Sequence, residues 1–276
     1  MENQTIKNKF ELSICSAVEI VILYTVIILG IIDTPFYFIA KINYFQTHQI
    51  AEAIIKVSGE VISRTIIVIL LLKKVRRQGH SNFKVKYVDK LNCKLLSTVI
   101  FLMIGYYLWF SSSIGIIIAK IPLPKFLDEV FENIYINSYF AVIAIAVIAP
   151  IFEEIVMRGI MLEGLLNKYK PQKAIIISAL IFGIWHFNIP QFINATLIGL
   201  ILGVLYYKTN SLILCIVIHI TNNTMAIIMD YLEYSPCRIS FVVGIGIFII
   251  SGILIIKYIK ELSAGKSNKE WKESQI

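Results

Sequence analysis

The segment YFAVIAIAVIAPIFEEIVMR, residues 139–158, decides the fold class of this chain. Residues 139–152 carry no charge, and Glu153, Glu154 and Arg158 then follow closely. Such a run approaches the roughly 20 apolar residues that a helix needs to cross a bilayer. An ionised side chain at bilayer depth costs roughly 2.5–3.5 kcal/mol on insertion scales. Charges are therefore rarely kept there without a polar partner or a function, and we look for function at these positions.

The composition indicates a membrane protein of all-α class. Hydrophobic residues make up 57% of the chain, charged residues only 16%, and the mean hydropathy is +0.76, which an ordinary soluble domain does not reach. The second apolar block is the least regular, because Lys56, Glu60 and Arg64 interrupt it at a spacing of four. We predict a polytopic bundle of about eight transmembrane helices, near residues 13–33, 53–72, 95–118, 138–160, 173–189, 191–207, 211–229 and 239–258.

The net charge of +8 reports membrane topology rather than a nucleic-acid partner. Basic residues concentrate in alternate loops, such as Lys73 to Arg77 and the tail from Lys257 onward, whereas the loops at 120–134 and 230–238 are mixed or acidic. The positive-inside rule then places both termini in the cytoplasm, which eight spans satisfy. An excess of isoleucine over alanine suggests an AT-rich bacterial genome. We expect a multi-pass protein of a bacterial cell membrane.

The chain is predicted to contain one transmembrane domain, residues 1–262, with a polar cytoplasmic tail at 263–276. Its polar motifs fall within a core at about 135–230. The four cysteines show no metal-ligand pairing, and their positions do not favour a disulfide framework.

Two further polar motifs lie in predicted spans. His186 falls in the fifth span, and His219 with Asn223 falls in the seventh. On a helix, residues spaced i,i+4 share a face, so His219 and Asn223 present donors to one point. Glu154 and Arg158 have the same spacing and should form an ion pair, whereas Glu153 points about 100° away.

These groups support hydrolysis by activated water. A glutamate without its own cation can serve as a general base, and a histidine beside it can orient or deprotonate the same water. A second histidine and an asparagine can stabilise the oxyanion of a tetrahedral intermediate. No serine or cysteine nucleophile with a matching base is evident, so a covalent mechanism is not favoured.

The three motifs together resemble the CAAX prenyl protease and bacteriocin-processing family, also called Abi, of intramembrane glutamate proteases. The motifs are Glu153-Glu154-x-x-x-Arg158, Phe182-x-x-x-His186 and His219-x-x-x-Asn223, in this order on successive apolar segments. The resemblance implies a metal-independent endopeptidase in an eight-helix bundle. It assigns water activation to Glu153 and His186, the oxyanion hole to His219 and Asn223, and structural support of the site to Glu154 and Arg158. Asn222 is the neighbouring alternative to Asn223.

The implied partners are the lipid bilayer and a membrane-associated peptide or a lipidated protein as substrate. In bacteria the resemblance indicates leader or pheromone peptides, or self-immunity against a bacteriocin; in eukaryotes it indicates prenylated C-termini. Three alternatives stay open. Glu153, His186 and His219 could hold zinc in a membrane metalloprotease, the chain could be a non-catalytic immunity or scaffold protein, or it could be a transporter, although no internal repeat relates its halves.

Overall fold

The computed structural model describes residues 10–77, 93–122 and 142–273, which are helical and contain no strand. The all-α prediction is confirmed for this part of the chain. Within the described residues, five helical segments are long and apolar enough to cross a membrane, and each coincides with a predicted span. They are Ile14–Ala40, Cys93–Ser111, Ile189–Thr209, Leu212–Tyr231 and Arg238–Glu261.

The other three predicted spans are helical in part but do not meet that description. Helix α4, Gln49–Arg77, is long but carries the charged stripe noted above. Helix α11, Pro171–Ile184, would extend only about 21 Å at 1.5 Å per residue, against a hydrocarbon core of about 30 Å. The predicted span at 138–160 begins outside the described residues. The total of eight spans therefore stays a prediction.

The chain divides into two compact units. The first comprises residues 1–86 and 123–204, and the second comprises 87–122 and 205–276. The boundary between them falls within α12, Ile189–Thr209.

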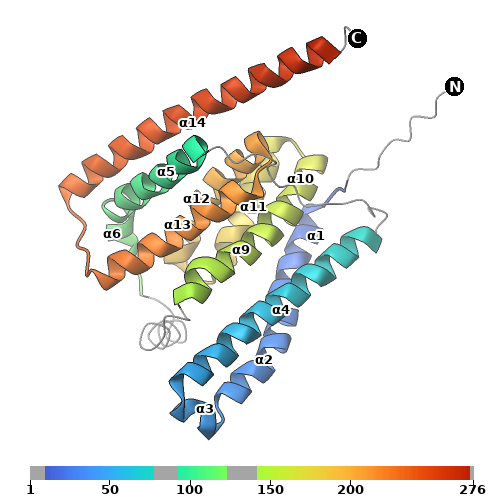
Figure 1. Ribbon diagram of the computed structural model, residues 1–276, viewed down its shortest axis with the longest axis vertical. Helices are drawn as coiled ribbons and strands as arrows, with labels where there is room; N and C mark the ends of the chain where they lie inside the picture. Colours follow the sequence, from blue (N-terminus) through green and yellow to red (C-terminus); the bar gives the residue numbers. More distant parts are fainter. Residues whose placement is uncertain (1–9, 78–92, 123–141, 274–276) are drawn as a thin grey trace, which may run out of the picture. The chain divides into compact units, whose positions relative to one another are not determined.

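The first unit opens with one continuous apolar helix followed by a reversal of the chain. The helix runs through α1 (Ile14–Glu19), a π-helical segment η1 (Ile20–Ile28) and α2 (Leu29–Ala40). The short helix α3, Asn43–Thr47, then leads into α4, which packs against α2 (Figure 1). Gly59 permits the approach, because a Cβ at this position would lie 2.6 Å from Cβ of Phe36.

The helix that carries the Glu153 motif alternates between α and π geometry. It passes through η2 (Ala144–Ile148), α9 (Ala149–Glu154), η3 (Ile155–Leu162) and α10 (Glu163–Lys168). Pro150 lies in the first turn of α9, where it cannot donate a backbone hydrogen bond. Every residue from Val156 to Leu162 is buried, so η3 lies inside the unit. π-Helical turns are rare and are frequent at functional sites.

Two contacts fasten the start of the described chain to the end of this helix. The backbone N–H of Leu12 donates to the Gly164 carbonyl at 2.9 Å, and the Asn167 amide donates to the Phe10 carbonyl at 2.8 Å. A Cβ at Gly164 would lie 2.6 Å from Cβ of Leu12, so glycine is what allows the segment to lie this close.

The second unit packs around α5, Cys93–Ser111, which α13 (Leu212–Tyr231) and α14 (Arg238–Glu273) both contact. Figure 1 shows α14 lying along α5. Their backbones come close at two glycines: a Cβ at Gly105 would lie 2.5 Å from the Phe248 nitrogen, and one at Gly244 would lie 2.5 Å from the Trp109 nitrogen. Such small residues are typical of close helix crossings in membranes.

This unit also contains one short helix. The short helix α6, Ile114–Ile118, follows α5. At the other end, α14 continues to Glu273 and so extends into the segment expected to be a polar tail.

Candidate active site

The two adjacent glutamates lie in different surroundings. The Glu154 carboxylate accepts a hydrogen bond from Nη1 of Arg158 at 2.7 Å, and their side chains are 0% and 1% exposed. This confirms the predicted i,i+4 ion pair. Nε and Nη2 of Arg158 are also buried, and the described residues offer them no hydrogen-bond partner. Glu153, one position earlier, is half-buried and faces a cavity.

The cavity at Glu153 has a volume of about 490 Å³, including space open to its surroundings. Its wall is mostly apolar, and Thr25, Arg64 and Glu153 supply its polar and charged side chains. The residues that line it come from η1, α2, α4, α9, η3 and the end of α11: Thr25, Leu29, Arg64, Ile67, Val68, Phe152, Glu153, Val156, Met157 and Trp185.

His186 lies just beyond the end of α11 rather than within a membrane-crossing helix, which corrects the prediction of a span to residue 189. The helix ends at Ile184 with Trp185 as its C-cap, and Phe187 then adopts φ 54°. The left-handed backbone at Phe187 stops the helix. Asn188 starts α12 by accepting a hydrogen bond from the Gln191 backbone N–H at 2.9 Å.

The turn fixes both the position of the imidazole of His186 and its tautomer. Nδ1 lies 2.9 Å from the carbonyl oxygen of Phe182. A carbonyl oxygen can only accept a hydrogen bond, so in the neutral ring the proton is assigned to Nδ1 and the Nε2 lone pair can accept one. Trp185, the preceding residue, lines the Glu153 cavity. The structure thus places the residue before His186 at the cavity and leaves Nε2 of His186 as a hydrogen-bond acceptor.

Phe182 connects the histidine to the buried ion pair. Its ring stands edge-on to the His186 ring, with centroids 5.2 Å apart and an interplanar angle of 88°. The Arg158 guanidinium carbon lies 4.4 Å from the centroid of the same ring, within cation–π range. The ion pair, the phenyl ring and the imidazole thus form one packed series within the first unit.

The third motif lies on α13 in the second unit. His219 and Asn222 are buried and Asn223 is half-buried. The Asn222 amide donates to Oδ1 of Asn223 at 3.2 Å, so the two candidate asparagines are in contact with each other. Ser211 caps the start of this helix by accepting a hydrogen bond from the Leu214 backbone N–H at 3.2 Å. The meeting of this motif with Glu153 and His186 around one water stays a prediction.

The cavity includes a cation that sequence reasoning did not assign to the site. Arg64 was recognised only as part of a polar stripe on the second apolar block, together with Lys56 and Glu60. That spacing was the available signal, but the packing of α4 against α9 that brings Arg64 to the Glu153 cavity is tertiary information. Within either unit, the described residues form no group of three His, Cys, Asp or Glu side chains suited to a metal ion.

The part of the chain that the structure describes is helical, with five segments long and apolar enough to cross a membrane. Its site has a buried ion pair and, one position earlier, a carboxylate that faces a cavity. Residues 135–225 match the family model described as "Type II CAAX prenyl endopeptidase Rce1-like". The resemblance predicted from the three motifs is thereby confirmed.

A curated relative supports the same class. The chain is 31% identical over 114 residues to the protein named "Putative membrane peptidase YdiL" of Bacillus subtilis (strain 168). The matched region covers 39% of this chain and 46% of the relative, so the chain spans less than half the length of the relative it matches. No solved structure matches the chain.

Proposed function

We propose that the protein is an intramembrane endopeptidase that hydrolyses a peptide bond with water activated by Glu153 and His186. The observation that carries the proposal is the separation of two adjacent carboxylates. Arg158 neutralises Glu154 in the interior, whereas Glu153 faces a cavity. A carboxylate that already has a buried cation is a poor base, so we assign proton transfer to Glu153, which faces the cavity.

In the proposed reaction, Glu153 accepts a proton from a water molecule that His186 Nε2 orients. The water oxygen attacks the carbonyl carbon of the scissile peptide bond and forms a tetrahedral intermediate. His219 and Asn223 donate hydrogen bonds to its oxyanion, a contribution that is often worth about 2.7–4 kcal/mol per donor. The C–N bond then breaks, and the proton held by Glu153 passes to the leaving nitrogen.

Glu154 and Arg158 support the site without touching the substrate in this mechanism. Their role is to hold Phe182, whose carbonyl fixes the tautomer of His186 and whose ring packs against it. We further propose an eight-helix bundle in a bacterial cell membrane, with both termini in the cytoplasm, because the basic loops alternate along the chain.

The proposed substrate is a membrane-associated peptide or a lipidated protein. The description of the matched family names CAAX prenyl endopeptidases, and the relative is named as a membrane peptidase. A leader or pheromone peptide is the bacterial counterpart, and cleavage of a bacteriocin would make the protein a self-immunity factor.

The test uses full-length protein in detergent micelles and two quenched-fluorescent probes, a farnesylated CAAX peptide and an unprenylated apolar leader-type peptide. The wild type should cleave at least one of them. The Glu153→Gln variant should lose this activity by at least about 10²-fold, as expected for loss of a general base. Glu19→Gln is the matched control, because Glu19 also lies in an apolar helix, where it pairs with Lys74 at 2.5 Å, and it does not line the cavity.

Three outcomes would redirect the assignment. Full activity in Glu153→Gln removes this residue from the mechanism. Loss of activity on treatment with 1,10-phenanthroline, with recovery on adding zinc, would establish the metalloprotease alternative with Glu153, His186 and His219 as ligands. A cellular immunity phenotype that survives loss of Glu153, His186 and Asn223 would establish the non-catalytic immunity or scaffold role.

A further inference from the structure

Arg64 places a positive charge in the cavity wall that also contains Glu153. It comes from α4, which lies outside the segment that matches the family model. Its counterpart charge in the wall is Glu153, and between them the lining is apolar apart from Thr25. The Thr25 hydroxyl donates to the Val21 carbonyl of its own helix at 2.7 Å. The cavity is therefore an apolar chamber with one cation and one anion.

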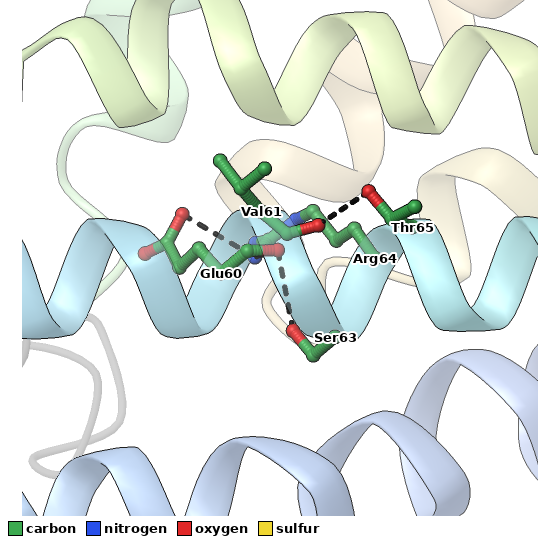
Figure 2. A network of polar contacts seen from close by, with 5 residues as sticks. All are labelled: Glu60, Val61, Ser63, Arg64 and Thr65. Atoms are coloured by element: carbon green, nitrogen blue, oxygen red, sulfur yellow. Dashed lines mark hydrogen bonds and ion pairs between the residues drawn. The ribbon is translucent and has the colours of Figure 1, made fainter.

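The contacts of Arg64 leave most of its guanidinium available. Nη1 lies 3.3 Å from a carboxylate oxygen of Glu60 and 3.4 Å from the Glu60 backbone carbonyl. Figure 2 shows the Arg64 side chain and its contact with Glu60 one turn back along α4. Both distances are at the long end for hydrogen bonds. A guanidinium has five N–H donors. Of the three Arg64 side-chain nitrogens, only Nη1 has a partner among the residues that the structure describes.

We propose that Arg64 is an anion-binding subsite of the Glu153 cavity and takes a carboxylate of the peptide substrate. The proposal rests on the function proposed above. A planar guanidinium binds a carboxylate through two parallel hydrogen bonds, which fixes the orientation of the ligand as well as adding energy. The side chain is 20% exposed, so it meets a ligand in a partly dry environment where such bonds gain strength.

The position of the subsite defines what it does for the reaction. Arg64 and Glu153 line the same cavity. A substrate carboxylate bound by Arg64 would therefore hold the neighbouring peptide bond close to Glu153. Binding energy from a group that does not react is then used to orient the scissile bond. Arg64 would thus determine which peptides are cleaved, and it is not one of the groups that activate water.

A phosphate group of an anionic lipid has the same oxygen chemistry and is the competing source of the anion. We assign the carboxylate because the occupant must also bring a peptide bond to Glu153, which a lipid headgroup does not. The two sources differ in a simple test, since only the peptide source depends on the charge of the peptide itself.

The experiment measures kcat and KM for paired probe peptides that end in either a free carboxylate or a carboxamide. It uses the wild type, Arg64→Met, Arg64→Lys and the control Lys56→Met, all as full chains in neutral detergent. Lys56 also pairs with a glutamate one turn away, Glu52 at 2.7 Å, but does not line the cavity. The same peptides are titrated against Glu153→Gln, with and without Arg64→Met, by fluorescence anisotropy, which reports binding without turnover.

In the wild type, KM should be about 10- to 100-fold lower for the peptide with the free carboxylate than for the carboxamide peptide. A factor of about this size corresponds to the usual contribution of a hydrogen bond to a charged group. Arg64→Met should abolish this preference, and Arg64→Lys should keep part of it. Lys56→Met should behave as the wild type. Elution by size exclusion and the melting temperature of each variant identify any that fail to fold.

Three results would overturn the subsite. They are a wild type indifferent to the peptide terminus, a preference that survives in Arg64→Met, and a preference that disappears when phosphatidylglycerol is added, which would assign the cation to lipid phosphate. If no peptide is cleaved but Glu153→Gln still binds the free carboxylate through Arg64, the proposed peptidase function fails and the subsite stands.

Discussion

Removal of the Arg158 cation alone should destabilise the protein far more than removal of the whole Arg158–Glu154 pair. Both side chains are essentially inaccessible, at 1% and 0% exposure, and are joined at 2.7 Å. Arg158→Met leaves the Glu154 carboxylate buried without its cation, and breaking a buried pair in this way costs about 3–5 kcal/mol. The double variant Arg158→Met, Glu154→Gln removes both charges and should cost much less.

The assay is a double-mutant cycle on the free energy of unfolding in mixed micelles. The coupling between the two positions should exceed about 2 kcal/mol, because residues in one buried ion pair are strongly non-additive. Activity gives a second readout. The double variant should remain impaired although it is stable, since Met cannot provide the cation that packs on the Phe182 ring beside His186. Additive effects, or a loss below about 1 kcal/mol in Arg158→Met, would refute the reasoning.

Three further changes have definite expected outcomes. Gly244→Leu should destabilise the packing of α14 on α5 by at least about 1–3 kcal/mol, since its Cβ would lie 2.5 Å from the Trp109 backbone nitrogen, and unfolding in micelles measures the loss. Cys237 lies between α13 and α14, and its thiol is exposed. Hydrogen bonds from the Ser240 backbone, which have the largest effect, and from the Ser240 side chain lower the pKa of this thiol. A lowered pKa gives more thiolate at neutral pH, so Cys237 should react with iodoacetamide faster than a model thiol at pH 7, and Ser240→Ala should slow it. Asn188→Ala should cost about 1 kcal/mol through loss of the α12 cap and should lower activity if the turn at His186 is disturbed.

The sequence was sufficient to predict helices and the buried ion pair, because both depend on local spacing. Residues four positions apart are neighbours on any helical surface. Glu154 and Arg158 have this spacing, and the structure contains their contact. The five long apolar segments follow from composition alone. Features that depend on helical periodicity can therefore be predicted from the sequence.

The end of α11 was not predicted because its signal is not periodic. Apolar residues continue through Phe187 and Ile189, so hydropathy places His186 inside a span. The chain instead turns at Phe187, whose φ is 54°. This left-handed conformation is usually occupied by glycine or asparagine, so a bulky phenylalanine gives no sequence signal for it. The cap at Asn188 is the sequence feature that could have indicated the turn, since asparagine is among the preferred residues for starting a helix.

The turn has a functional consequence that the predicted long helix lacks. If α11 continued as a regular helix, the Phe182 carbonyl would accept the backbone N–H of His186. In the turn that N–H bonds to Gly183 instead, and the Phe182 carbonyl receives the imidazole Nδ1. The same departure from helical geometry that hydropathy could not predict therefore selects the tautomer with a basic Nε2. In membrane proteins, backbone that leaves a helix is tolerated where it is buried in protein or lines a water-filled cavity. Trp185 places this turn at the cavity that contains Glu153.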